Sequence, residues 1–260
     1  MYNRNIHCQE RYYTSFDVDF VENRGQNYVL PEDYEWIPKK KSQIRKQKWA
    51  YLLARIFAYF YCKFRLHITV VGKEKIRDVG KSGFFLYGNH TLAMGDVFLP
   101  AHVCGSKRVF IVADTANLGI PVVGKWLPCL GALPIPSGIK AMAKFCAAIN
   151  TRIEQGCCVT LYPEAHLWPY CTFIRPMSRT AFRFPVENRV PSFTLSVTFQ
   201  KRRFGKKPRI TAFVDGPIVP DANLTLREQS ADLQSKVMKT IKDRLIANTY
   251  TYVNYIKSPL

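Results

Sequence analysis

Two residues capable of acid–base chemistry stand close together after an apolar segment of the chain. His90 and Asp96 follow the aromatic-rich run Phe84-Phe-Leu-Tyr-Gly-Asn89, which is typical of a buried strand that ends in a sharp turn. A histidine at a strand end can act as a general base, because its unperturbed pKa lies near neutral pH. A carboxylate one or two turns later can accept the other ring N–H and stabilise the imidazolium. The simpler alternative is a solvent-facing turn histidine followed by an aspartate that caps a helix.

A second apolar run ends in ionisable residues in the same way. The segment Gly156-Cys-Cys-Val-Thr-Leu-Tyr-Pro-Glu-Ala-His166 is typical of a strand that stops at Pro163, since proline lacks the N–H that a central strand needs. In an open α/β sheet, ligands bind outside the carboxyl ends of the strands. Two strands that both end in ionisable residues therefore predict a site at one edge of such a sheet.

These two segments resemble motifs of the glycerolipid acyltransferase family, the group that contains the lysophosphatidic acid acyltransferases. The first motif of that family is Asn-His, four residues and Asp, whereas five residues separate Asn89-His90 from Asp96 here. Its third motif is Phe-Pro-Glu-Gly-Thr-Arg. The segment Tyr162-Pro-Glu164 matches its start, and Ala165-His-Leu167 replaces its last three residues, including the arginine.

The resemblance covers about residues 65 to 220, with the motifs in the family's order. Further matching segments are Leu118–Trp126 and Leu130–Ile135 of the second block, Arg175–Phe182, and Val190-Pro191 of the fourth motif. The arginine that usually ends the second block is missing near Ser137. The strings 162–170 and 174–176 are similar to a divergent bacterial branch that shares the extra residue before the aspartate.

The resemblance implies an α/β fold with a central mixed, largely parallel sheet flanked by helices. It also implies acyl transfer from a thioester, either acyl-CoA or acyl carrier protein, to a lysophospholipid or related lipid hydroxyl, without a cofactor or metal. His90 is then the general base and Asp96 orients it. The substrate-binding set would include Asn89, Glu164 and His166, with Glu164 either binding acceptor hydroxyls or bracing the turn. Arg175 would replace the missing phosphate-binding arginine, because a guanidinium can bind phosphate through two hydrogen bonds. The alternative for Arg175 is a surface salt bridge.

The cysteine content favours a reducing compartment. The chain has eight cysteines without a C-x-x-C pair, and Met1–Arg11 is too polar for a secretory signal. We therefore expect the cysteines to be small core residues of a protein at the cytoplasmic face of the cell membrane. An alternative is a zinc site built from His166, Cys171 and the pair Cys157-Cys158, although this spacing matches no structural zinc pattern.

The charge of the chain calls for an anionic partner. The net charge is +19, and the basic run at residues 39–48 leads into the aromatic segment Trp49–Phe64. Arg55 and Lys63 interrupt that segment, so it is too short to span a bilayer and instead resembles a helix lying at the membrane interface. The alternative is a helix packed on the sheet with a solvated basic leader.

A different class of function is also compatible with the charge. A non-enzymatic protein that binds anionic membrane or nucleic acid can use the basic runs 39–48 and 201–207. No RNA- or DNA-binding fold pattern occurs, so we expect no specific nucleic acid partner. A serine hydrolase is disfavoured because the chain lacks a G-x-S-x-G elbow.

The predicted layout has four parts. Residues 1–46 form an irregular polar and aromatic arm, 47–66 the interfacial helix, 67–250 the α/β domain and 251–260 a tail. Within the α/β domain we expect helices over 139–153 and from the capping box Thr225-Leu-Arg-Glu228 onward, with strands over 192–198 and 209–214.

Overall fold

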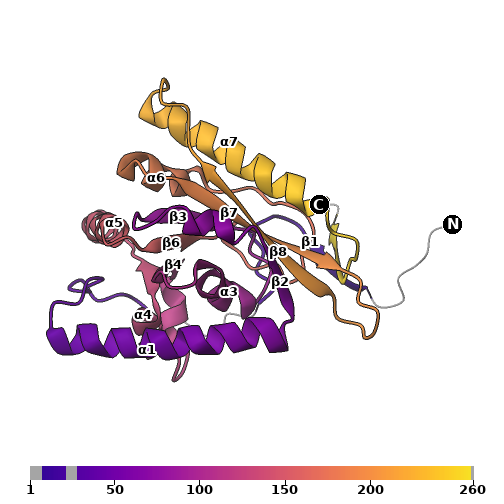
Figure 1. The fold of residues 1–260 in the computed structure, drawn as a ribbon, viewed down its shortest axis with the longest axis horizontal. Helices are drawn as coiled ribbons and strands as arrows, with labels where there is room; N and C mark the ends of the chain where they lie inside the picture. Colours follow the sequence, from indigo (N-terminus) through magenta and orange to yellow (C-terminus); the bar gives the residue numbers. More distant parts are fainter. Residues whose placement is uncertain (1–7, 22–27, 259–260) are drawn as a thin grey trace.

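A seven-stranded mixed sheet forms the centre of the molecule (Figure 1). The computed structural model describes residues 8–21 and 28–258. The strand order is β2-β8-β7-β3-β6-β4-β5. In chain order the strands are β2 (Ile68–Val71), β3 (Phe84–Gly88), β4 (Val109–Asp114), β5 (Ala132–Ile135), β6 (Cys158–Leu161), β7 (Ser192–Gln200) and β8 (Arg209–Ile218).

Most of the sheet is parallel. Strands β7, β3, β6, β4 and β5 run in one direction, whereas β8 is antiparallel to β7 and carries β2 alongside it in parallel. The predicted α/β class with a mixed, largely parallel sheet is confirmed. The carboxyl ends of β3 and β6 lie next to each other, because these two strands pair directly.

Helices cover both faces of the sheet (Figure 1). They are α1 (Lys41–Phe60), α2 (Glu74–Arg77), α3 (Gly95–Cys104), α4 (Leu127–Leu130), α5 (Ile139–Glu154), α6 (Arg183–Asn188) and α7 (Leu226–Leu245). Helices α1 and α3 pack on one face, and α5, α6 and α7 on the other. A strand that is buried on both faces needs a nearly continuous apolar sequence, and β3 has one.

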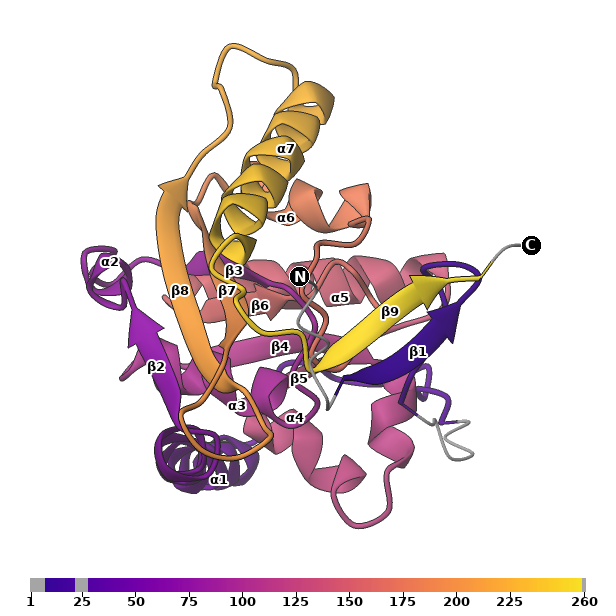
Figure 2. The same ribbon diagram turned by 90° about the vertical axis from the view of Figure 1, so that its right-hand side faces the viewer.

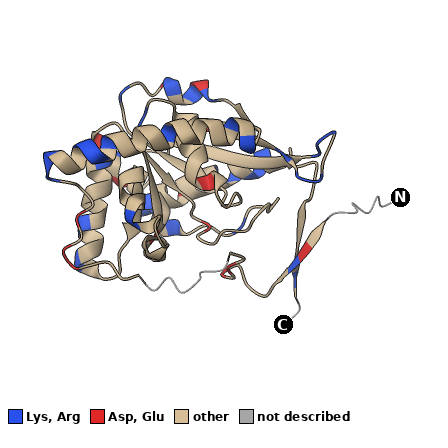
Figure 3. Cartoon of the chain, turned by 90° about the horizontal axis from the view of Figure 1, so that it is seen from below, with Lys and Arg blue, Asp and Glu red and all other residues tan. Residues whose placement is uncertain are grey.

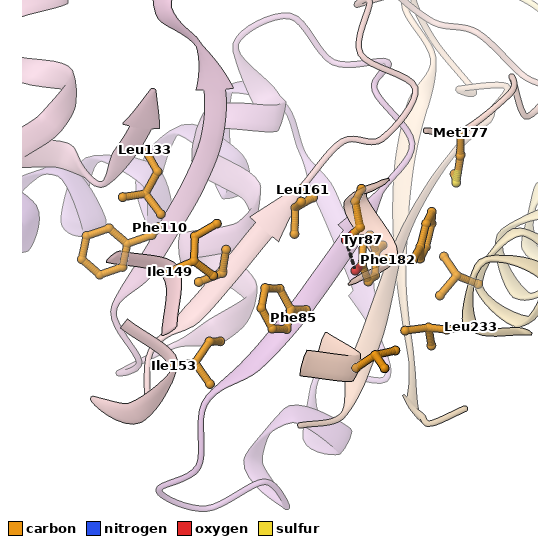
Figure 4. Packing of buried hydrophobic residues seen from close by; sticks show 14 of the residues in the cluster. Phe85, Tyr87, Phe110, Leu133, Ile149, Ile153, Leu161, Met177, Phe182 and Leu233 are labelled. Atoms are coloured by element: carbon orange, nitrogen blue, oxygen red, sulfur yellow. Dashed lines mark hydrogen bonds between the residues drawn. The ribbon is translucent and has the colours of Figure 1, made fainter. Parts of the chain in front are cut away.

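The side chains of β3 alternate between the two hydrophobic cores. Phe84 and Leu86 join the core shared with α1 and α3, whereas Phe85 and Tyr87 join the core shared with α5 and α7. Figure 4 shows the second core, where Tyr87 stacks on Phe182 with ring centroids 4.6 Å apart. Tight packing on both faces fixes the strand whose end carries His90.

The predicted helices and strands of the C-terminal half are present. Helix α7 begins after Thr225, whose side chain accepts the backbone N–H of Glu228 while the Glu228 carboxylate accepts the backbone N–H of Thr225. This capping box is as predicted. Helix α5 covers the predicted 139–153, and β7 and β8 extend the predicted strands by a few residues.

The two ends of the chain are more ordered than predicted. The prediction of an irregular arm over 1–46 is wrong for β1 (Gln9–Tyr13), and that of a tail over 251–260 is wrong for β9 (Val253–Lys257). These strands pair in parallel as a separate two-stranded ribbon (Figure 2). The ribbon packs on the buried ring of Trp168, which stacks on Tyr255 at 4.8 Å. Residues 1–7, 22–27 and 259–260 of the predicted arm and tail lie outside the described residues.

Helix α1 begins earlier than predicted. It starts at Lys41, so most of the basic run 39–48 is helical, and a π-helical turn continues it through Tyr61–Arg65. The predicted start at residue 47 followed the apolar pattern alone, whereas Lys, Gln and Arg are themselves good helix formers. One side of the helix, including Tyr51 and Ala58, is buried against the body of the protein.

Asp215 of β8 gives a pH-dependent link between β8 and the helices beside it. Its carboxylate accepts hydrogen bonds from Arg244 of α7 at 2.6 Å and from Lys75 of α2 at 2.8 Å, and these bonds hold its pKa below the usual value. A lowered pKa in the folded state stabilises the fold above the unfolded pKa of about 4, and this contribution disappears as the pH falls through the folded value. We expect Asp215→Asn to lower the free energy of unfolding at neutral pH, and the difference from the unaltered protein to vanish in acid. Denaturant titrations across this range measure it, and a difference that stays constant with pH would contradict it.

Candidate active site

The ends of two adjacent parallel strands bring the predicted site residues together. Tyr87 of β3 lies opposite Leu161 of β6, so the segments that follow, Asn89-His90 and Tyr162–Glu164, leave the sheet at the same edge. This is the edge at which open α/β sheets form their sites. The predicted arrangement of two ionisable strand ends is therefore present.

His90 and Asp96 form a direct hydrogen-bonded pair. The distance from His90 Nδ1 to Asp96 Oδ2 is 2.7 Å, and Asp96 lies in the first turn of α3. The same oxygen accepts the backbone N–H of Leu92 at 2.9 Å, and Leu92 O accepts the backbone N–H of Asp96 at 2.8 Å. This closed turn accommodates five intervening residues. With Nδ1–H donated to the carboxylate, Nε2 is left as the basic nitrogen.

The environment of this pair is suited to proton transfer. The Asp96 side chain is 2% exposed and that of His90 is 22% exposed, so the acid is buried while the base can be reached. Burial raises the pKa of Asp96, and the hydrogen bonds from His90 and from the backbone of Leu92 and Thr91 oppose that rise. A positive charge that develops on His90 is therefore stabilised by a carboxylate with few other partners.

Tyr162 supports both members of the pair, a role that the sequence motif did not predict. Its ring stacks on His90 with centroids 4.7 Å apart, and its hydroxyl donates to the backbone carbonyl of Asp96 at 2.7 Å. The family motif has phenylalanine at this position, so the added hydroxyl was the available signal in the sequence. Gly88 makes room for the ring, because a Cβ at Gly88 would lie 2.4 Å from a ring carbon of Tyr162.

We predict that Gly88→Ala disturbs the His90–Asp96 pair without unfolding the domain. The added methyl must push the Tyr162 ring off His90, since 2.4 Å is far inside the van der Waals contact distance. Activity should fall by more than tenfold, while Tyr162→Phe, which keeps the stack and loses one hydrogen bond of about 1 kcal/mol, should retain more of it. Steady-state kinetics of both variants test this, and equal activities would contradict it.

Glu164 and Arg175 form a buried ion pair behind His90. Arg175 Nη2 donates to Glu164 Oε2 at 2.7 Å, and the two side chains are 1% and 2% exposed respectively. Glu164 also accepts the backbone N–H groups of His90 and Arg175, both at 3.0 Å, and Arg175 Nη2 lies 3.3 Å from the carbonyl oxygen of His90. The pair therefore holds the backbone of the histidine in place, which agrees with the bracing role considered for Glu164.

Asn89 and His166 are placed differently. The Asn89 side chain is buried and joins Val197 of β7, accepting its N–H at 2.8 Å and donating to its carbonyl at 3.0 Å. This arrangement extends the β3–β7 pairing by one residue. His166 Nδ1 lies 2.8 Å from Asp19 Oδ1, which connects it to the N-terminal segment. In the described structure these two side chains contact protein groups away from the His90 ring.

The loop after Glu164 forms the wall behind the histidine. The backbone N–H of Trp168 donates to His90 O at 3.1 Å, and that of Tyr170 donates to Thr91 O at 2.9 Å. The Trp168 ring carries the Arg175 guanidinium over its face at 4.8 Å. Because the same ring packs on the β1–β9 ribbon, the chain ends support the site from behind.

The alternative zinc site is not formed. Across residues 8–21 and 28–258, no group of three or more His, Cys, Asp or Glu side chains is placed to hold a metal ion. Cys157 and Cys158 lie at the start of β6, at the opposite end of that strand from His166, and all eight cysteines are free thiols.

Comparisons with known proteins bear on the fold. No protein-family model and no curated protein sequence matches the chain. Among solved structures, it is similar to the 1-acyl-sn-glycerophosphate (LPA) acyltransferase PlsC from Thermotoga maritima. The TM-score is 0.57 at 14% sequence identity, over 81% of this chain and 86% of that one. The chain thus has the fold of that acyltransferase, and the fold that the motif resemblance implied is confirmed.

Proposed function

We propose that the protein is an O-acyltransferase that moves a fatty acyl group from a thioester to the hydroxyl of a lysophospholipid or related lipid. The observation that carries this proposal is the His90–Asp96 pair, with Nδ1 and Oδ2 2.7 Å apart, at the carboxyl edge of an acyltransferase-like sheet. A partly exposed histidine oriented by a buried carboxylate is suited to deprotonating an alcohol.

The reaction needs only one base. His90 Nε2 takes the proton of the acceptor hydroxyl while the oxygen attacks the thioester carbonyl. The tetrahedral intermediate collapses, the C–S bond breaks, and the imidazolium returns the proton to the departing thiolate. Asp96 stabilises the imidazolium between these steps. The products are an ester and a free thiol, and no acyl group is attached to the enzyme.

Two thioester donors and several classes of lipid acceptor fit this mechanism. Acyl-CoA and acyl carrier protein both present the required thioester. For the acceptor, the interior position of Arg175, which is 1% exposed and paired with Glu164, favours recognition through groups other than this guanidinium. Lysophospholipids with a phosphodiester headgroup, aminolipids and other lipid alcohols are then candidates beside lysophosphatidate.

An activity screen tests the proposed function. The full-length protein is incubated with each thioester and each acceptor, and ester and free thiol are quantified together. We expect equal amounts of both products for at least one combination. Thiol release without ester would indicate a thioesterase, and no product in any combination would contradict the proposal.

We also propose that the protein works at an anionic membrane surface, on the cytoplasmic face and as a peripheral protein. In the described part of the chain, no helix combines the length and apolar character needed to cross a bilayer. Helix α1 and the turn after it nevertheless present an exposed apolar stripe opposite their buried side. The stripe consists of Trp49, Leu53, Ile56, Phe57, Phe60 and Phe64.

Basic residues accompany the stripe. Figure 3, which views the molecule from the side of α1, shows Lys and Arg along this helix and on the loop between β7 and β8. Aromatic side chains flanked by basic ones are typical of helices that lie at the headgroup level. Anionic lipids would attract these charges, with about 1 kcal/mol for each residue near the surface.

Substitutions in the stripe test the membrane proposal better than a truncation, because α1 is also part of the core through Tyr51 and Ala58. We expect Trp49→Ser with Leu53→Ser to weaken binding to vesicles of phosphatidylcholine and phosphatidylglycerol by more than about tenfold. The reason is that fully burying one such side chain contributes about 1.5–3 kcal/mol. Leu226→Ser with Ile246→Ser, at the two ends of α7 on the other face of the sheet, is the matched control. Equal losses in sedimentation with vesicles would place the contact surface elsewhere.

A further inference from the structure

A pocket lies between α1 and the C-terminal end of α3, away from the catalytic pair. Its volume is about 320 Å³, and its lining includes Arg55, Ile56, Phe60, Lys73, His102 and Gly105. Asp96 stands in the first turn of α3 and His102 in the last, so the two sites are at opposite ends of the helix. None of the residues that line the pocket contacts His90 or Asp96 through a hydrogen bond.

The polar lining of the pocket is cationic. No Asp or Glu lines it, and Lys73 has no ion pair within the described ranges. Arg55 uses Nη1 to bind the carbonyl oxygens of Gly105 and Ser106, at 3.3 and 3.4 Å, which fixes the guanidinium at the end of α3. Its Nε and Nη2 donors have no protein partner in the part of the chain that is described.

His102 also lines this wall. Its Nδ1 is buried and lacks a hydrogen-bond partner among the described residues. Burial lowers the pKa of His102, and the nearby charges of Lys73 and Lys63 lower it further. The Tyr59 ring lies beside the imidazole with centroids 5.6 Å apart, and Arg55 completes the charged surroundings.

The rim of the pocket is apolar and belongs to the exposed stripe of α1. Ile56 is 48% exposed and Phe60 is 54% exposed, and both line the pocket as well as the stripe. A ligand seated here would therefore meet cations at its inner end and apolar side chains at the outer end. A headgroup with attached acyl chains has this distribution of charge and apolar surface, whereas a free anion or a nucleic acid strand does not.

We propose that this pocket binds the phosphate of an anionic phospholipid of the bilayer, as a membrane-docking site distinct from the catalytic site. Arg55 and Lys73 would bind the phosphate oxygens, the His102 ring would donate a hydrogen bond to them, and Ile56 and Phe60 would contact the upper acyl chains. The inference rests on the proposed position of α1 at the membrane surface and is independent of acyl transfer.

A bound phosphate has a measurable effect on His102. An anion beside the imidazole favours its protonated form, so the pKa of His102 rises on binding and binding strengthens as the pH falls. The groups that face the ring are Tyr59 and Arg55 on α1, Lys63 in the turn after it, and Lys73 between β2 and α2. Among side chains of these types, only an imidazole ordinarily changes its charge between pH 5 and 8, so His102 is the group that can report a bound phosphate.

The test uses the full-length protein with His90→Ala, so that turnover plays no part. The pKa of His102 is followed by NMR with bicelles of phosphatidylcholine, with and without phosphatidylglycerol, and is assigned with His102→Gln. We expect a rise only when phosphatidylglycerol is present. No rise, or the same rise with phosphatidylcholine alone, would overturn the proposal. The same rise with inorganic phosphate and no lipid would do so too, because it would indicate a site for a soluble anion.

A matched pair of variants separates the pocket from general charge attraction. Arg55→Gln with Lys73→Gln removes two cations from the pocket, and Arg45→Gln with Lys48→Gln removes one Arg and one Lys from the exposed start of α1. General attraction predicts similar losses of vesicle binding, about fivefold per charge. We expect the pocket pair to lose at least about tenfold more than the control pair. Equal losses would show that the pocket has no specific role, whatever the outcome of the acyltransferase screen.

Discussion

Replacing His90 by alanine is expected to lower kcat/KM for acyl transfer by about 10²–10⁴-fold, the usual contribution of a positioned general base. The acceptor alcohol is a weak nucleophile. Among the residues that the structure describes, the only side chain with a basic group that hydrogen-bonds to the His90 ring is Asp96, which is buried. The loss should appear in kcat, because the proton is transferred in the transition state and not on binding.

The folded state should tolerate this change. The His90 side chain is 22% exposed, and the bonds that fix the turn come from its backbone to Glu164 and Trp168, which alanine retains. The thermal midpoint should therefore fall only modestly, because Asp96 loses its imidazole partner but keeps the backbone N–H of Leu92. His67→Asn, at an exposed histidine just before β2, is the matched control and should keep full activity.

Asp96→Asn tests the contribution of the carboxylate separately from that of the histidine. An amide in place of the carboxylate can no longer stabilise the imidazolium, so kcat should fall, while removal of a buried charge leaves stability similar or higher. If His90→Ala keeps most of its activity, the histidine is not the base and the mechanism must be abandoned. If only Asp96→Asn is active, the histidine works without its partner.

The central sheet could be predicted because its signals are local. Phe84–Gly88 and Cys158–Leu161 are short apolar runs ended by turn residues, and the capping box at Thr225 marks a helix start within four positions. The pairing of Gln9–Tyr13 with Val253–Lys257 joins the two ends of the chain. Neither segment has a sequence pattern that identifies the strand with which it pairs, so this ribbon could not be predicted from the sequence.

The pairing of His90 with Asp96 was predictable from the sequence, but the residues that support the pair were not. The spacing of His90 and Asp96 indicated a pair, and the structure supplies the closed turn at Leu92 that permits an extra residue. The stacking of Tyr162 on His90 depends on the register of β3 against β6. The burial of Arg175 depends on the loop that places its guanidinium against the Trp168 ring. Contacts of this kind arise from tertiary packing, which residue spacing does not contain.

Breaking the Glu164–Arg175 pair should have the largest effect on stability. Both side chains are almost completely buried, so Glu164→Gln leaves a guanidinium charge in the interior without its counterion. Loss of one partner from such a pair costs about 3–5 kcal/mol, whereas replacement of both by uncharged groups costs much less. We expect the double variant Glu164→Gln with Arg175→Met to lose less free energy of unfolding than the two single variants lose together. The difference should be about 1.5–3 kcal/mol in denaturant titrations.

The kinetics of the same variants distinguish bracing from phosphate recognition by Arg175. Glu164 and Arg175 both contact the backbone of His90, so a bracing pair positions the base for every acceptor. Arg175→Met should then lower kcat by a similar factor for lysophosphatidate and for acceptors without a phosphate. A guanidinium that binds the acceptor phosphate would instead raise KM for lysophosphatidate alone and leave the other acceptors unaffected. In that case the free energies of unfolding of the Glu164 and Arg175 variants would be nearly additive, because the counterion of Arg175 would be the substrate phosphate and not Glu164. Since the guanidinium already donates to Glu164 at 2.7 Å and is 1% exposed, we expect the uniform loss in kcat together with strong coupling.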